Sequence, residues 1–200
     1  MLKKIIFFDV ETNGLKGTSV LSMSAMKMSF DTETLEMYKL GEFNRFYFRD
    51  KEEPINEGAI SVNGLTDEEI ERRRSQDEVK YPLTFKEDIN SFIEFCEGCK
   101  HYVAHNIRFD RDFVPFKLEY QFDTMIENID IVRIMGARGY KWPKLMECAG
   151  FYKVPLEENN LHNSLYDVEV MAKVFFRMRK NSIGKNRILR FVNNNISTAF

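Results

Sequence analysis

Apolar residues near the N-terminus follow one another without alternation, and residues 4–10 read Lys-Ile-Ile-Phe-Phe-Asp-Val. A strand that is covered on both faces has this pattern, because neither of its sides meets water. Residues 20–30 and 36–48 have the composition of two further strands, and Gly41 interrupts the second of them. The pattern therefore predicts that the chain begins with strands of a buried sheet.

Helical periodicity begins further along the chain. Thr66–Glu69 and Thr84–Glu87 both have the capping-box pattern, in which the two side chains satisfy the first amides of a helix. We expect a short charged helix after the first box and an amphipathic helix after the second, with Gly98 as its stop. The apolar residues at helical spacing in the second helix are Phe85, Ile89, Phe92, Ile93 and Cys96.

The second half of the chain alternates between the two kinds of pattern. Tyr102–Asn106 predicts a strand that runs into a helix near Asp110, and Ile129–Ile134 predicts another strand. Further helices are expected at residues 142–150 and 163–180. Because strands come first and then alternate with helices, the order predicts an α/β fold with a mixed central β-sheet flanked by α-helices.

Composition narrows the class of protein. A chain of 200 residues, 44% of them hydrophobic, has the size of one domain with a sizeable core. No apolar run approaches the length that spans a bilayer. The three cysteines cannot all pair, which favours a reducing compartment, so we expect a cytoplasmic protein.

Charge is distributed unevenly along the chain. The formal net charge is −2, but residues 171–200 contain seven basic groups and no acidic group, which leaves 22 basic and 31 acidic groups before them. An acidic body with a basic end suits a protein that holds cations in one place and phosphates in another. A last helix with a solvated basic face is the alternative. We expect a domain at residues 1–180 and a basic C-terminal extension at 181–200.

Two carboxylates stand at the end of the first predicted strand. Asp9 and Glu11 are two residues apart and point to the same side, with their Cα atoms about 6.6 Å apart at strand rise. Such a pair repels unless a cation lies between the two groups. Hard divalent ions such as Mg²⁺ or Mn²⁺ take oxygen ligands of this kind. The alternative is a pair of solvated carboxylates at a strand end.

Two more acids and a histidine follow at element boundaries. Asp110 and Asp167 each fit the first turn of a helix, so either has a structural explanation as a cap. His162 lies five residues before Asp167, and in one continuous helix the two side chains would point about 140° apart. We therefore expect His162 on a loop before the helix, where it can reach a site that Asp167 lines.

Together these residues resemble the DnaQ-like 3′→5′ exonucleases with a catalytic histidine (DEDDh), the superfamily of the polymerase proofreading (epsilon) subunits, RNase T and oligoribonuclease. Ile60–Thr66 is similar to the family's Val-His-Gly-Ile-Thr segment, with Asn63 in place of histidine. The sister branch has a tyrosine at the position of Asn163, so the histidine branch fits better. The three motifs that carry the resemblance are Phe8-Asp9-Val-Glu11-Thr-Asn-Gly-Leu15, His105-Asn106-Ile-Arg-Phe-Asp110 and His162-Asn-Ser-Leu-Tyr-Asp167.

The resemblance implies an RNase H-like fold, a mechanism and a set of roles. Asp9 is expected to bridge two Mg²⁺ or Mn²⁺ ions, Glu11 and Asp167 to hold the ion that carries the attacking water, and Asp110 to anchor the second ion. His162 is the expected general base, since its ordinary pKa of about 6.5 allows proton uptake near neutral pH. The expected product is a 5′-mononucleotide. The expected substrate-binding residues are Thr12 (through its backbone), Leu15 and Asn106.

The motifs leave the substrate and partners open. A 3′ end of single-stranded DNA is our first expectation, and an RNase T-like or oligoribonuclease-like RNA trimmer is the alternative, because metals at the phosphate do not read the sugar. A noncatalytic nucleic-acid-binding module is a third reading, and the presence of all five motif residues counts against it. The segment Asn195-Ile-Ser-Thr-Ala-Phe200 resembles a sliding-clamp-binding peptide, so a clamp or polymerase partner is a further hypothesis.

Overall fold

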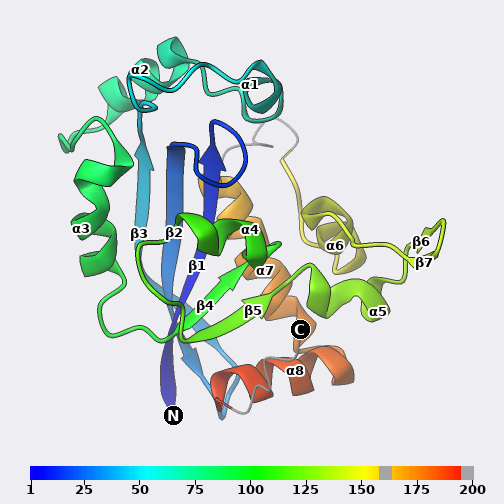
Figure 1. Ribbon diagram of the computed structural model, residues 1–200. Coiled ribbons are helices and arrows are strands. Elements are labelled where there is room, and N and C mark those ends of the chain that lie inside the picture. The colour runs from blue at the N-terminus through cyan, green and yellow to red at the C-terminus, as the bar shows by residue number, and fades with distance from the viewer. Residues whose placement is uncertain (158–163, 195–200) are drawn as a thin grey trace.

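The computed structural model describes residues 1–157 and 164–194. Its centre is a mixed five-stranded sheet in the order β3-β2-β1-β4-β5 (Figure 1). The antiparallel strands are β1 (Leu2–Thr12), β2 (Val20–Asp31) and β3 (Met37–Phe46), and the strands that run parallel to β1 are β4 (His101–Ala104) and β5 (Tyr120–Asp123). The predicted mixed α/β sheet is confirmed.

Helices cover both faces of the sheet. The helix α3 (Phe85–Phe95) lies along one face and α7 (Ser164–Met178) along the other (Figure 1). The other helices and short turns are α1 (Glu57–Asn63), α2 (Asp67–Gln76), α4 (Ile107–Asp110), η1 (Arg111–Phe113), η2 (Ile126–Asn128), α5 (Ile129–Val132), α6 (Leu145–Phe151) and α8 (Ser182–Val192). A small hairpin, β6 (Met135–Gly136) and β7 (Gly139–Tyr140), projects beside α5 and α6.

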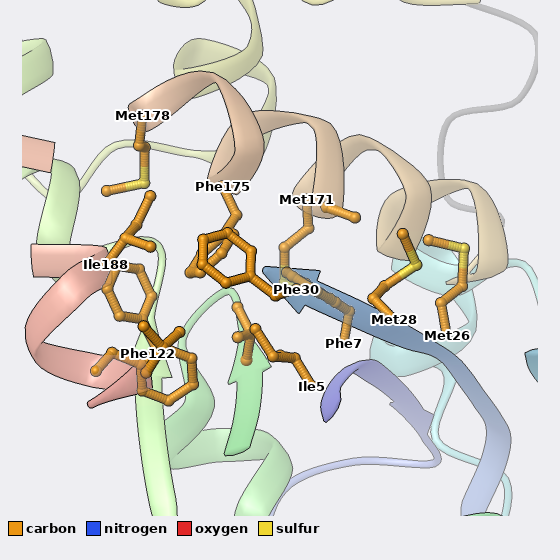
Figure 2. Close-up of a cluster of buried hydrophobic side chains, with 14 of the residues drawn as sticks. Ile5, Phe7, Met26, Met28, Phe30, Phe122, Met171, Phe175, Met178 and Ile188 are labelled. Carbon is orange, nitrogen blue, oxygen red and sulfur yellow. The ribbon is translucent and has the colours of Figure 1, made fainter. Parts of the chain in front are cut away.

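Strand β1 divides its side chains between two cores. Ile6, Phe8 and Val10 pack with α3, whereas Ile5 and Phe7 pack with α7. Figure 2 shows Phe175 of α7 at the centre of the second core, where its ring contacts the rings of Phe7, Phe30 and Phe122 at centroid distances of 5.2, 6.3 and 5.1 Å. Since alternate residues share a face, Asp9 and Glu11 continue the row of Ile5 and Phe7 toward α7.

The expected helix caps are present. The Thr66 hydroxyl accepts the Glu69 amide at the start of α2. The Thr84 and Glu87 pair forms the full capping box of α3. The predicted interruption at Gly41 is also found, since the register between β2 and β3 shifts opposite it.

The segment after the fifth strand differs from the prediction. Ile129–Ile134 was expected to be a strand, but Ile129–Val132 forms the short helix α5, and the strand lies earlier, at Tyr120–Asp123. The Asn128 side chain donates to the Thr124 carbonyl at 2.7 Å and starts this turn. A six-residue segment whose longest apolar run is Ile131-Val132 is too short to show a clear period, so tertiary contacts decide its conformation.

The basic C-terminal segment packs against the sheet. Ile188, Phe191 and Val192 of α8 are buried in the core beneath α7. Arg187 pairs with Asp130 at 2.7 Å and with Glu127 at 3.2 Å, so acidic groups of the body neutralise part of this basic end. Among residues 1–157 and 164–194, no helix is long and apolar enough to cross a membrane.

Candidate active site

The first two carboxylates lie next to two serines of the neighbouring strand. In the antiparallel register Asp9 is opposite Ser24, and Glu11 is opposite Ser22. Both serines are fully buried, and they lie on the face of the sheet that α7 covers. The acidic end of β1 is therefore joined to α7 through a polar patch on β2.

Ser164, the first residue of α7, connects this patch to the third acid. Its hydroxyl lies 2.6 Å from the hydroxyls of both Ser22 and Ser24, and Ser24 in turn donates to Asn44 at 2.8 Å. Asp167 follows one helical turn later, so it lies on the same side of α7 as Ser164. The serine cluster therefore fixes where the helix brings its carboxylate, and the motifs gave no sign of it.

Replacing Ser164 with alanine is expected to lower nuclease turnover about tenfold and the free energy of unfolding by about 1–3 kcal/mol, because the buried hydroxyl of Ser22 loses its partner and that of Ser24 loses one of two. Turnover falls because the first turn of α7, and with it Asp167, is less firmly placed. Ser182→Ala, at the exposed start of α8, is the matched control and should change neither quantity. Urea unfolding and a nuclease assay check both effects, and full turnover in Ser164→Ala would contradict this role.

A fifth acidic residue, Asp123, positions the fourth carboxylate, Asp110. Asp123, at the end of β5, accepts the backbone amides of Asn106 at 3.0 Å and Ile107 at 3.1 Å. Asn106 has a left-handed backbone with φ of 74°, which asparagine tolerates better than most residues. The anchored turn ends β4 and starts α4, which carries Asp110 as its last residue. Asp110 also precedes η1 as its N-cap residue, but its side chain makes no capping hydrogen bond there.

The Asp110 side chain contacts the first strand, β1. Its Oδ1 accepts the backbone amide of Val10 at 3.2 Å, between Asp9 and Glu11 in the chain. Asp110 is 2% exposed. Two segments that are a hundred residues apart therefore meet at the end of β1.

The pKa values show that these acids lie close enough to repel one another. Burial raises the pKa of Asp9 well above its usual value, and the charges of Asp110, Glu11 and Asp167 raise it further. Burial and the charge of Asp167 raise the pKa of Glu11 to about 7, against a hydrogen bond from Asn63 that lowers it. The four carboxylates that the motifs singled out therefore share one region of the molecule.

The pKa of Asp110 is raised as well. Burial is the main cause that raises its pKa well above the usual range, and the charges of Asp123 and Glu11 add to it. The backbone amide of Val10 acts in the opposite direction, because it stabilises the ionised form. Sites that must receive cations commonly have this arrangement of buried like charges.

The four carboxylates are of the right chemical type to bind hard divalent cations, since carboxylate oxygens are the ligands that Mg²⁺ and Mn²⁺ prefer. Within the described parts of the chain, however, no three acidic, histidine or cysteine side chains are already gathered tightly enough to hold an ion. Coulomb repulsion acts over longer distances than coordination, which needs oxygens about 2.0–2.6 Å from the ion. Rotations of these side chains are therefore required before they ligate.

A groove opens beside the carboxylates. It has a volume of about 400 Å³. Leu15 and Val62 line this groove, and 79% and 66% of their surfaces are exposed. The residues that line it include Glu11, Thr12, Leu15, Val62, Asn63 and Phe109. Two of the expected substrate-binding residues, Thr12 and Leu15, therefore lie beside Glu11, and the third, Asn106, lies at the turn before α4.

Asn63 joins the groove to the acidic cluster. Its side-chain amide donates to the Thr12 carbonyl at 3.0 Å and to the Glu11 carboxylate. Its oxygen accepts the Leu65 amide at 3.0 Å. The residue that replaces the family's histidine in this segment thus orients Glu11, a role that its position in the sequence did not reveal.

Two of the three histidines are engaged elsewhere. His101 is buried, and its Nε2 lies 2.8 Å from the Asn194 oxygen. His105 lies with Nδ1 2.9 Å from the Thr124 hydroxyl and Nε2 3.0 Å from the Pro143 carbonyl. Burial lowers the pKa of both, which keeps them neutral near pH 7. His162, the expected base, lies outside the described residues, as does the segment 195–200 that resembles a clamp-binding peptide.

The chain matches an exonuclease family model and part of two bacterial DNA polymerases. Residues 6–175 match the family model RNase_T, described as "Exonuclease". The DNA polymerase III PolC-type of Bacillus cereus is 28% identical over 189 residues, and that of Mycoplasma genitalium is 26% identical over 182 residues. These alignments cover 90% and 88% of this chain but only 12% and 11% of the polymerases, so the chain spans about an eighth of their length or less.

Solved structures with the same fold are nucleases. Exonuclease X in complex with 5′ overhanging duplex DNA has a TM-score of 0.62 and 21% identity, with 90% of this chain and 92% of that chain covered. Exonuclease I from Methylocaldum szegediense has a TM-score of 0.69 and 14% identity, with 96% and 43% covered. The family match spans most of the chain, and the acidic cluster lies within it. The chain therefore belongs to the RNase_T exonuclease family, as a DnaQ-like member with an RNase H-like fold.

Proposed function

We propose that this protein removes nucleotides one at a time from the 3′ end of single-stranded DNA and releases 5′-mononucleotides. The observation that carries the proposal is the group of four carboxylates at the end of β1, in which the charges of Asp110, Glu11 and Asp167 raise the pKa of Asp9. Like charges that are buried together destabilise the fold, so a requirement other than stability explains their presence. Binding of cations beside a phosphodiester is that requirement.

Asp9, Glu11 and Asp167 would hold one divalent ion, and Asp9 with Asp110 a second. Ions bound there would supply an activated water and neutralise charge on the scissile phosphate. The protein's own contribution is to place the oxygens. The Val10 amide donates a hydrogen bond to Asp110, and the Asn63 side chain donates one to Glu11.

The groove beside Glu11 would receive the terminal nucleoside. Leu15 and Val62 offer exposed apolar surface for a base, and the buried backbone around Thr12 lies next to them. A nucleoside in the groove would lie next to Glu11, so the last phosphodiester would lie near the carboxylates. His162, five residues before Asp167 in the sequence, is the proposed base, since the other two histidines are hydrogen-bonded and neutral.

DNA is the favoured substrate because the relatives with printed names are DNA polymerases, of which this chain matches a small part. By the same argument we propose that the protein acts on the ends that a DNA polymerase makes. RNA is the second candidate, because the acidic cluster itself does not distinguish the two sugars.

The deciding experiment is a nuclease assay on matched DNA and RNA strands that carry a label at the 5′ end. We expect a ladder of products shortened from the 3′ end in Mg²⁺ or Mn²⁺, no products in EDTA, and faster loss of DNA than of RNA. Faster loss of RNA would move the assignment to the RNA trimmers. No cleavage of either strand in any divalent ion would overturn the proposed function.

Replacing Leu15 with alanine is expected to reduce kcat/KM for single-stranded DNA about tenfold, because a base loses its apolar contact at the groove. Val79→Ala is the matched control, since Val79 is 64% exposed but lies outside the groove. Thermal stability should not change in either variant, because both side chains are largely in water. Equal activity of both variants would remove Leu15 from the substrate site.

A further inference from the structure

The β6–β7 hairpin and the residues after it carry basic and apolar side chains together. Residues 133–144 read Arg-Ile-Met-Gly-Ala-Arg-Gly-Tyr-Lys-Trp-Pro-Lys, with four basic residues and no acidic residue. This concentration is unusual in a chain whose formal net charge is −2. The hairpin projects from the body beside α5 and α6 (Figure 1).

Several large side chains of this segment are exposed to solvent. Met135, Tyr140 and Trp142 are 71%, 47% and 61% exposed, and Trp142 is the only tryptophan of the chain. Arg138, at the tip of the hairpin, and Lys144 are exposed as well. Aromatic rings gathered on a projecting element are typical of a binding surface rather than of a fold-stabilising one.

The base of the hairpin is fixed to the protein. The Lys141 amide donates to the Ile134 carbonyl at 2.9 Å, and the Lys141 side chain pairs with Glu147 of α6 at 2.5 Å. The surface therefore has a defined position, although its tip extends into solvent.

That position is linked to the active site. His105 Nε2 lies 3.0 Å from the carbonyl of Pro143, the residue next to Trp142. His105 opens the turn that leads to Asp110, the carboxylate bound to β1. The groove for the terminal nucleoside includes residues of α1, which lies over the end of β1 and away from the hairpin (Figure 1). The hairpin and the groove thus flank the carboxylates.

We propose that Arg138, Tyr140, Trp142 and Lys144, here called the hairpin surface, bind the single strand upstream of the scissile phosphate. This inference rests on the proposed function, because it assigns the remainder of the same substrate. Bases of a single strand stack on aromatic rings, and basic side chains near the rings bind the phosphates. A duplex does not fit, since its bases stack on one another and expose only their edges.

Two double variants test the hairpin surface. Tyr140→Ala/Trp142→Ala removes the rings, and Arg138→Glu/Lys144→Glu reverses the charges. Tyr38→Ala is the aromatic control, because Tyr38 is 61% exposed on the edge strand β3. Lys80→Glu/Lys117→Glu is the charge control, because both lysines are exposed and lie in other loops. Thermal melts should show that all four proteins are folded.

Two substrates separate the hairpin surface from the active site. One is a single-stranded DNA of about 20 nucleotides, longer than the roughly 4–16 nucleotides that single-strand-binding folds cover. The other is the p-nitrophenyl ester of thymidine 5′-monophosphate, which reaches only the carboxylates and the groove. We expect both hairpin variants to lose about tenfold or more in kcat/KM on the strand, with no change on the ester. Both control variants should match the wild type on both substrates.

Salt gives an independent reading of the charge variant. Each phosphate contact to a single strand adds about 0.7 to the slope of log affinity against log salt, so Arg138→Glu/Lys144→Glu should lower the slope by about 1.4 or more. Affinity is measured by fluorescence anisotropy of the labelled strand in EDTA, where no cleavage is expected. The ring variant should weaken binding without a comparable change of slope.

Several outcomes would overturn the inference. Wild-type kcat/KM on the strand in both hairpin variants would do so, and so would an equal loss on strand and ester, which places the effect in the active site. If the wild type cleaves neither substrate, the proposed function fails. The anisotropy measurement then still decides, because loss of strand binding in the hairpin variants alone supports the surface and unchanged binding rejects it.

Discussion

Replacing Asp9 with asparagine is expected to abolish nuclease turnover and, at the same time, to raise the thermal stability of the protein in EDTA at pH 8. Asp9 is half-buried near three other carboxylates, and its burial and their charges raise its pKa. Asparagine keeps the shape of the side chain and removes the charge, so the repulsion disappears. It also removes an oxygen that cations need, and we expect turnover to fall roughly a thousandfold or more.

The opposite signs of these two effects distinguish a catalytic acid from a structural one. Asp88 is the matched control, because it is 3% exposed but accepts hydrogen bonds from Arg45 at 2.6 Å and from Tyr47 at 2.8 Å. Asp88→Asn should cost about 1.5–3 kcal/mol of stability, as is usual for hydrogen bonds to charged groups, and leave turnover intact. Calorimetric melts and the nuclease assay measure both. An Asp9→Asn protein that is less stable and fully active would contradict the assignment.

In EDTA, the free energy of unfolding is expected to rise by about 3 kcal/mol as the pH falls from 8 to 4.5, through Glu11 alone. Its pKa is about 7 in the folded protein, against 4.5 for an ordinary glutamate. A carboxyl whose pKa is raised by folding binds its proton more tightly in the folded state. The stabilisation is therefore complete below the unfolded pKa of 4.5 and is lost as the pH rises through 7. Urea unfolding at several pH values measures it.

The comparison with Glu11→Gln isolates this contribution, since the amide does not titrate. The difference in unfolding free energy between wild type and Glu11→Gln should change between pH 4.5 and 7 and be constant above and below that window. A difference that does not vary with pH would show that Glu11 is not buried beside Asp167.

Divalent cations are expected to reverse the effect of high pH. At pH 8, Mn²⁺ or Mg²⁺ at a hundred times its dissociation constant should raise the unfolding free energy by about 2.7 kcal/mol. Near pH 7 its binding should release protons, because ligation requires the ionised carboxylates. Asp9→Asn should lose both responses, and Asp88→Asn should keep both. Equal stabilisation of the two variants by Mn²⁺ would place the cation elsewhere.

Local patterns were sufficient for several elements. The apolar run Ile5–Phe8 within residues 4–10 predicted β1, because burial on both faces leaves a signal in the strand itself. The capping box at Thr84 predicted the start of α3, since the groups that satisfy a helix end lie within four residues of it. The order of three short motifs singled out Asp9, Glu11, Asp110 and Asp167 before any coordinate was known.

Other features depend on contacts between distant residues, and no local pattern records those. The run Ile129–Ile134 has the composition of a strand but forms a helical turn that Asn128 starts. The prediction missed β5, whose last residue, Asp123, anchors the turn before Asp110. Asn128 also accepts a hydrogen bond from Tyr152, and Asp123 accepts the amides of an earlier segment, so these interactions are absent from the window in which a pattern is read.

The sequence by itself determined the central strand, the main caps and the identity of the acidic residues, because these follow from periodicity and residue chemistry over a few positions. The tertiary structure alone decided that Ser164 joins α7 to Ser22 and Ser24 and that Asn63 reaches Glu11. It also brought the amide of Val10 to Asp110 across a hundred residues. Folding selects such pairs by how the elements pack, and packing is a property of the whole chain.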